Sequence, residues 1–146
     1  MSLSSIESAA ERNRDGLLLL ARILLAAIFV QSGFNKLMGF DGFAASMAAK
    51  GLPLSLLWTM AAVAAEFGGS LCILFGLATR LIALLMVVFV AFAAVLGHPF
   101  WVADAEHYQA QYVNFMKNVA IMGGYLALLV AGPGAVSLDG WRRRSR

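Results

Sequence analysis

The chain has few of the residues that many enzymes use for redox and metal chemistry. Among its 146 residues there is one cysteine, Cys72, and there are two histidines, His98 and His107. A single cysteine excludes an intrachain disulfide and a C-x-x-C thiol relay, so a disulfide-exchanging enzyme would need thiols from a partner. The two histidines form no ligand pair at helical spacing and lie outside the centres of the apolar runs, which predicts neither a metal site nor a haem site.

Charged residues are also scarce, at 13% of the chain, whereas hydrophobic residues make up 61% and the mean hydropathy is +0.80. This composition indicates an integral membrane protein with a single membrane domain, residues 1–146. The apolar runs are continuous and rich in Ala, Leu and Gly, which favours spanning helices over the alternating strands of a barrel. Four of the eleven basic residues lie in the final WRRRSR. We therefore expect contact with anionic lipid and no binding of nucleic acid.

The apolar runs predict an all-α membrane protein, with four transmembrane helices in an up-down bundle. The expected spans are residues 17–36, 54–77, 81–97 and 114–131. A polar segment, residues 1–15, precedes them and has a short amphipathic helix that begins at Ser4 or Ser5. A basic tail, residues 132–146, follows them. The tight turn at residues 78–80 predicts that the second and third spans run antiparallel, side by side.

The connections between spans carry interfacial signals. A short helix at about residues 42–49 is expected to lie on the membrane surface between the first two spans. Asp41 is suited to capping its start, Gly51 to ending it and Pro53 to opening the next helix. The segment from residue 98 to about residue 112 holds acidic and aromatic side chains, which predicts a loop at the membrane–water boundary.

Basic residues indicate how the bundle is oriented. Arg12, Arg14 and Arg80 fall at the same end as the tail arginines, whereas the lysines fall nearer the other end. Because basic residues are enriched in cytoplasmic segments, we expect both termini in the cytoplasm.

Glu66 lies at the centre of the second span, where a carboxyl group is costly and usually functional. With a rise of 1.5 Å per residue, Glu66 lies about 16 Å above the cytoplasmic end, and Gln31 and Lys117 about 21 Å. Lys117 is therefore the favoured ion-pair partner of Glu66, and Gln31 and Asn118 are suited to complete its hydrogen bonds. Arg22, about two turns below Glu66, is the competing partner. The sequence leaves the choice open.

Other polar residues cluster in the outer half of the predicted bundle. We expect them to line a pocket between the helices, because charged groups rarely face lipid. The candidate ligand-binding residues are Lys36, His98, Gln31, Asn114, Asn118 and Arg22. The alternative interpretation is a satisfied ion network that only fixes the helix register.

The order of these features resembles the DoxX family of small four-helix bacterial membrane proteins. The resemblance rests on ARILLAAIFVQSGFNKLMGF, KGLP, AAEFGGSLCILFGLATR, HPFW and NFMKNVAIMGG, and covers about residues 17–131. It implies a multi-pass protein of the bacterial inner membrane. The family is named for a subunit of a terminal quinol oxidase, and related members are linked to thiosulfate:quinone chemistry and to oxidative-stress complexes. Some animal relatives act as assembly chaperones.

Two hypotheses follow from the residues and the resemblance together. The first is a redox-linked accessory component whose pocket binds a quinone or a small anionic molecule, with Glu66 and Lys117 as the catalytic pair that moves protons. Any oxidoreductase activity would then need electrons from the quinone or from a partner membrane or redox protein. The second is a non-enzymatic scaffold or assembly factor for partner membrane proteins. A homo-oligomer is compatible with both.

Overall fold

The computed structural model describes residues 2–145. This part of the chain contains helices and no strand, which confirms the all-α fold. Four helical stretches are long and apolar enough to cross a membrane. They are Arg14–Met38 (α2), Ser55–Phe75 (α4, η1 and α5), Thr79–Val102 (α6 and η2) and Ala105–Ala131 (α7). The shorter helices are Leu3–Arg12 (α1), Phe40–Ala49 (α3) and Leu138–Arg144 (α8).

The second span changes its helical form along its length. It begins as an α-helix, Ser55–Val63 (α4), continues as the π-helical segment Ala64–Gly69 (η1) and ends as an α-helix, Ser70–Phe75 (α5). The third span is the α-helix Thr79–Gly97 (α6), followed by a short 3₁₀ turn, Phe100–Val102 (η2).

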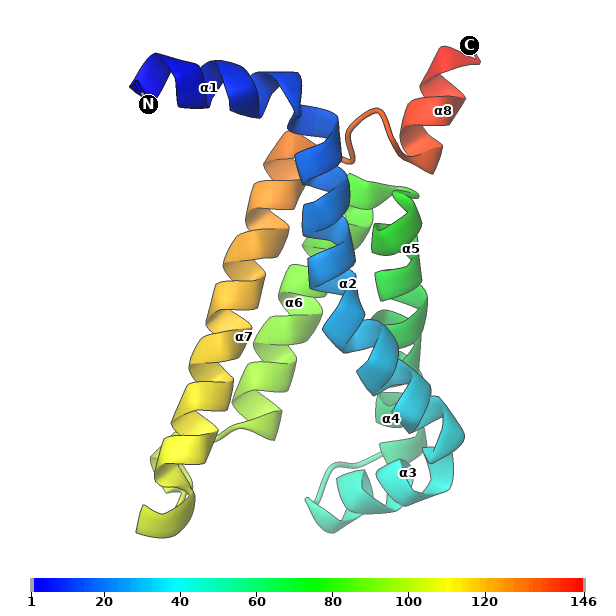
Figure 1. The fold of residues 1–146 in the computed structure, drawn as a ribbon. Coiled ribbons are helices and arrows are strands. Elements are labelled where there is room, and N and C mark those ends of the chain that lie inside the picture. Colours follow the sequence, from blue (N-terminus) through cyan, green and yellow to red (C-terminus); the bar gives the residue numbers. More distant parts are fainter. Residues whose placement is uncertain (1, 146) are drawn as a thin grey trace.

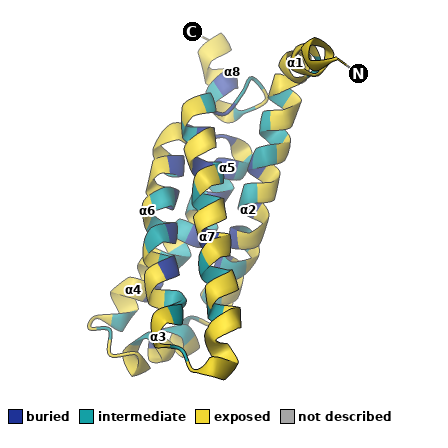
Figure 2. Cartoon of the chain, turned by 90° about the vertical axis from the view of Figure 1, so that its left-hand side faces the viewer, coloured by how far each residue is buried: buried dark blue, intermediate teal, exposed yellow. Residues whose placement is uncertain are grey.

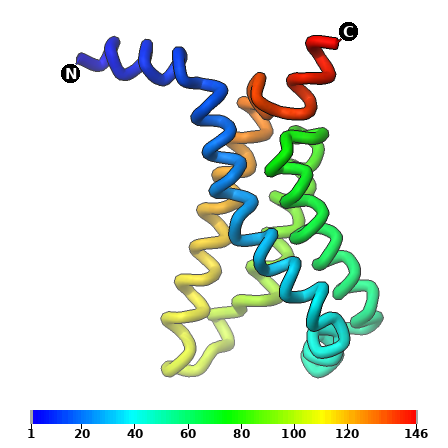
Figure 3. Tube along the Cα trace, turned by 45° about the vertical axis from the view of Figure 1, so that its right-hand side comes forward, coloured from blue at the N-terminus to red at the C-terminus, as the bar shows by residue number. Residues whose placement is uncertain are grey.

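The four spans form two antiparallel pairs. One pair is α2 with the second span, and the other is α6 with α7 (Figures 1 and 3). The pairs lie close together at the end that carries both termini and diverge toward the end that carries α3 (Figure 1). This arrangement confirms the up-down order and the antiparallel second and third spans. Gly76 and Ala78, both in the left-handed backbone region, make the tight turn between α5 and α6.

The core lies between the two pairs. Figure 2 shows the buried positions turned toward the interior of the bundle and the exposed positions on its outer faces. The core residues are Ala26, Phe29, Ile73, Ala83, Met86, Val90, Tyr125 and Leu128. The exposed faces of the spans are themselves apolar, which suits contact with lipid.

Three helical segments, α2, Ser55–Phe75 and α6, begin and end within three residues of the first three expected spans, but α7 begins much earlier than residue 114. Its first helical residue is Ala105, so most of the expected loop is helix. The reason is the cap at Asp104, whose carboxylate accepts a hydrogen bond of 2.9 Å from the backbone N–H of His107. Glu106 in the first turn adds a favourable interaction with the helix dipole.

Smaller predictions also need correction. The helix α3 begins at Phe40 behind the cap residue Gly39, so Asp41 lies in its first turn and does not cap it. Gly51, two residues after the end of α3, has a φ of +75°, as the predicted helix end requires. The N-terminal helix α1 begins after Ser2, whose side chain accepts a hydrogen bond from the Ser5 N–H.

Candidate functional site

The π-helical segment η1 is the local feature on which the site is built. Its six residues, AAEFGG, hold Glu66 with only 7% of its surface exposed. Short π-helical turns within α-helices are often found at functional sites, because the wider turn changes the direction in which its side chains point. The Ser70 hydroxyl donates hydrogen bonds to the carbonyl oxygens of Glu66 and Phe67, which stabilises the end of the segment.

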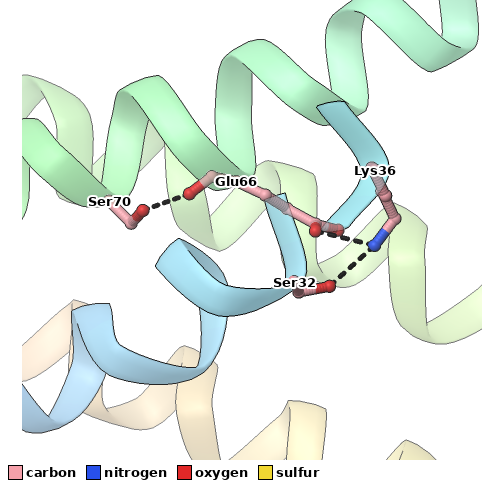
Figure 4. Close-up of polar contacts among 4 residues, drawn as sticks. All are labelled: Ser32, Lys36, Glu66 and Ser70. Atoms are coloured by element: carbon pink, nitrogen blue, oxygen red, sulfur yellow. Dashed lines mark hydrogen bonds and ion pairs between the residues drawn. The ribbon is translucent and has the colours of Figure 1, made fainter. Parts of the chain in front are cut away.

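Glu66 forms an ion pair with Lys36 of α2 (Figure 4). The distance from the Lys36 Nζ to the Glu66 Oε2 is 2.7 Å, and the same ammonium donates to the Ser32 Oγ at 2.7 Å. The Lys36 Nζ also lies 5.1 Å from the ring centroid of Phe43 on α3, which adds a cation–π contact. Three elements, α2, α3 and η1, therefore hold this pair in place.

The glycine at position 33 explains why α2 and η1 can bring these side chains together. Gly33 packs directly on the backbone of Glu66 and Phe67, where a side chain would not fit. Lys36 follows Gly33 by one helical turn, so it lies on the same face of α2 and points to the neighbouring Glu66.

A cavity of about 500 Å³ adjoins the ion pair. It is bordered by α2, α3, α4, η1 and α6, at the end of the bundle where the two helix pairs diverge. Its polar lining consists of Lys36, Lys50, Glu66 and His98, and its aromatic lining of Phe43, Trp58, Phe89 and Phe92. An apolar cavity of this size with a few convergent polar groups is typical of a small-molecule site.

The predicted residues divide between this cavity and other places. Lys36, Glu66 and His98 line it together. His98 ends α6, and its Nδ1 lies 3.0 Å from the Gln111 Oε1 on α7. Gln31 is exposed and borders a separate apolar groove beside α2.

The favoured pairing of Glu66 with Lys117 is wrong. Lys117 is exposed, and its Nζ donates at 2.9 Å to the Asn114 Oδ1 on its own helix. Asn114 in turn donates to the Ala110 carbonyl at 3.0 Å, and Asn118 is buried in the bundle. Because the helix pairs diverge at this end, a similar height along the bundle does not bring α7 to η1.

The competing pairing with Arg22 is also wrong. Arg22 is fully buried, and its guanidinium donates to the carbonyl oxygens of Leu74 and Val136. It lies near the other end of α2, where it links α5 to the C-terminal segment. Within residues 2–145 the ion pairs are Lys36 with Glu66 and His107 with Asp104.

Three members of the site were not assigned to it from the sequence: Ser32, Gly33 and Lys50. Ser32 precedes Lys36 by four residues, which is the spacing of hydrogen-bonded neighbours on a helix. Gly33, three residues before Lys36, is a signal of close helix packing. The pair Gly68-Gly69 after Glu66 is a signal that the regular helix is weakened where η1 forms. Lys50 carried no signal beyond its positive charge.

Comparisons with known proteins identify relatives of this chain. The sequence model of the DoxX family matches residues 17–99, which include Lys36, Glu66 and His98 but not Lys117. The inner membrane protein YphA of Escherichia coli (strain K12) is 41% identical over 126 residues, which cover 86% of this chain and 90% of YphA. The inner membrane protein YqjF of the same organism is 39% identical over 121 residues, which cover 83% of this chain and 88% of YqjF. No solved structure gives a significant match. With its four spanning helices and these relatives, the chain is an integral membrane protein that belongs to the DoxX family.

Proposed function

We propose that the protein is a redox-linked accessory component whose cavity binds a quinone or a small amphipathic anion. The observation that carries this proposal is the Lys36–Glu66 ion pair at the border of a largely apolar cavity of about 500 Å³. The aromatic walls suit a planar ring or an acyl chain, and the ammonium of Lys36 suits a carbonyl or anionic oxygen.

The chemistry assigned to the chain is binding and proton transfer. Reduction of a quinone to a quinol takes two electrons and two protons, and the electrons come from a partner redox protein in this proposal. The Lys36 ammonium is placed to donate a proton to a ligand oxygen. Glu66 is placed to take up a proton from water at the cavity and to pass it to the neutral amine that Lys36 then carries. His98 lines the same cavity, and the contact of its Nδ1 with the Gln111 Oε1 fixes the orientation of the imidazole ring there.

The proposal also assigns an orientation. Arg14 begins α2, Arg80 lies in the first turn of α6, and α8 carries Arg142, Arg143 and Arg144. These parts of the three helices lie at the end of the bundle that carries both termini (Figure 1). The positive-inside rule places this end in the cytoplasm, and the cavity then opens in the periplasmic half of the membrane.

The test is binding of a short-chain ubiquinone analogue to the purified full-length protein in lipid nanodiscs. Trp58 lines the cavity, so quenching of tryptophan fluorescence reports occupancy. We expect Lys36→Met and Glu66→Gln to weaken binding by about tenfold or more, because a charge-assisted hydrogen bond contributes about 1.5–3 kcal/mol. Lys117→Met is the matched control and should bind as the unmodified protein does.

Equal affinity in all variants, or an equal loss in Lys117→Met, would contradict the proposed site. The scaffold hypothesis predicts a different result. It predicts that Lys36→Met and Glu66→Gln lower the thermal stability of the protein, while the quinone analogue stabilises no form of it.

A further inference from the structure

The C-terminal segment forms a fixed part of the bundle and is not a loose tail. It ends in α8, which lies over the turn between α5 and α6 (Figure 1). The carboxylate of Asp139 accepts hydrogen bonds of 2.9 Å from the backbone N–H groups of both Ala78 and Thr79. Arg22, buried inside the bundle, holds the Val136 carbonyl just before α8. The arginines that α8 carries are thereby placed against the end of the bundle.

Two adjoining grooves at this end are lined by arginines. One has a volume of about 400 Å³ and the other of about 480 Å³. Arg80, Pro133 and Arg143 border both grooves, so the two are neighbours. Arg142 lines the first groove, and Arg14 and Arg144 line the second.

The positive charge of these grooves is only partly balanced within the described residues, where five arginines face the two carboxylates of Asp15 and Asp139. The carboxylate of Asp15 is used by the Ala135 N–H at 2.7 Å, and that of Asp139 caps α6. Among residues 2–145 the five groove arginines form no ion pair. The described lining residues of the two grooves therefore carry a net positive charge.

Two of the groove arginines are also held in position. Arg14 donates to the Ala131 carbonyl at 3.1 Å, and Arg80 donates to the Val130 carbonyl at 3.2 Å. A guanidinium has five N–H donors, so each keeps donors for a further acceptor after this bond. A planar guanidinium fits two oxygens of one phosphate, and a fixed one loses little entropy on binding it.

We propose that these two grooves bind the head group of an anionic phospholipid with two phosphates, as in a diphosphatidylglycerol. Each groove accepts one phosphate, and Arg80 and Arg143 lie between them and contact both. Exposed apolar side chains near the grooves, Leu81, Val130 and Trp141, supply contacts for acyl chains. Basic pockets at the cytoplasmic ends of spanning helices are suited to such head groups.

The experiment measures lipid binding to the purified full-length protein in detergent by native mass spectrometry. Diphosphatidylglycerol, phosphatidylglycerol and neutral phosphatidylcholine are added in turn, and glycerol 3-phosphate serves as a soluble phosphate without acyl chains. We expect the tightest binding for diphosphatidylglycerol and at least tenfold weaker binding in Arg80→Gln and Arg143→Gln. Arg143 donates only to Asp139 of its own helix among the described bonds, so Arg143→Gln should leave the bundle folded.

Arg12→Gln is the matched control, because it removes the same charge from α1 and Arg12 lines neither groove. An equal loss in Arg12→Gln would overturn the proposal in favour of bulk charge. Equal binding of phosphatidylglycerol and diphosphatidylglycerol would overturn the two-phosphate site. Binding of glycerol 3-phosphate as tight as that of the lipid would overturn the lipid assignment, and unchanged binding in Arg143→Gln would exclude the grooves.

Discussion

Gly33 of α2 and Phe67 of η1 are in direct backbone contact. A Cβ atom at position 33 would lie 2.4 Å from the Phe67 nitrogen and 2.8 Å from the Glu66 carbonyl carbon, closer than nonbonded atoms can approach. Lys36 lies one turn after Gly33, and Glu66 immediately precedes Phe67. The same close contact therefore sets the distance between the two helices and the position of the ion pair.

We predict that Gly33→Ala separates α2 from η1 and weakens the ion pair. Overpacking of a close contact costs about 1–3 kcal/mol, and the obstacle here is backbone, which cannot turn aside as a side chain can. Thermal unfolding in detergent measures the loss. The matched control is Gly123→Ala on α7, where a Cβ atom meets nothing within 4 Å. Equal unfolding temperatures for the two variants would show that the contact between α2 and η1 accommodates a methyl group at position 33.

A second prediction concerns the ion pair itself. Removing one partner of a buried pair costs about 3–5 kcal/mol, and the 20% exposure of the Lys36 side chain places the expected loss near the lower end. Lys36→Met should therefore lower stability more than Lys36→Met combined with Glu66→Gln, because the double variant leaves no unpaired carboxylate. A double-mutant cycle of unfolding free energies measures this coupling. A coupling of zero would mean that the pair is not formed in solution.

The number and the up-down order of the spans could be predicted from the sequence because each apolar run is long enough to cross a membrane. The partner of Glu66 could not. Counting 1.5 Å per residue gives a height along a helix, but it gives neither the rotation of the helix nor the separation of its neighbours. Lys117 has a suitable height, yet the divergence of the helix pairs keeps α7 away from η1. Lys36 was predicted only as a ligand-binding residue, and its long side chain reaches Glu66 from near the end of α2.

The π-helical form of η1 was a second obstacle to prediction. Wheel positions assume 3.6 residues per turn, and a π turn changes the rotation of every residue that follows it. Arg22 shows a third limit. The sequence offered it as a competing partner of Glu66, whereas its bond to Val136 depends on how the C-terminal segment folds back, which no local pattern predicts.

A third prediction tests the cavity without changing its charges. Ala93 of α6 lines the cavity, so Ala93→Leu should fill part of it and weaken binding of the quinone analogue at least tenfold. Filling a cavity commonly adds about 0.5–2 kcal/mol to stability, so the unliganded variant should unfold at an equal or higher temperature. Ala120→Leu on the exposed face of α7 is the matched control. Undiminished binding in Ala93→Leu would place the ligand elsewhere.

The last prediction concerns the pH dependence of the α8 contact. Burial alone would raise the pKa of Asp139, but hydrogen bonds from the N–H groups of Thr79 and Ala78 and from the Thr79 hydroxyl, with the nearby Arg143, lower it overall. The fold therefore favours the charged carboxylate. Its contribution to docking is complete above the ordinary pKa of 3.8 and is lost as the pH falls through the lower folded value.

Trp141 of α8 can report this change once the other two tryptophans are replaced by Trp58→Phe and Trp101→Phe. Its fluorescence should stay constant from neutral pH to about 5 and change only in stronger acid. Asp139→Asn should loosen α8 at neutral pH and remove the acid transition, because an amide does not titrate and cannot accept from both N–H groups equally well. Asp104→Asn, which changes the cap of α7 at the opposite end, should leave the transition in place. A transition that persists in Asp139→Asn would assign the acid response to another group.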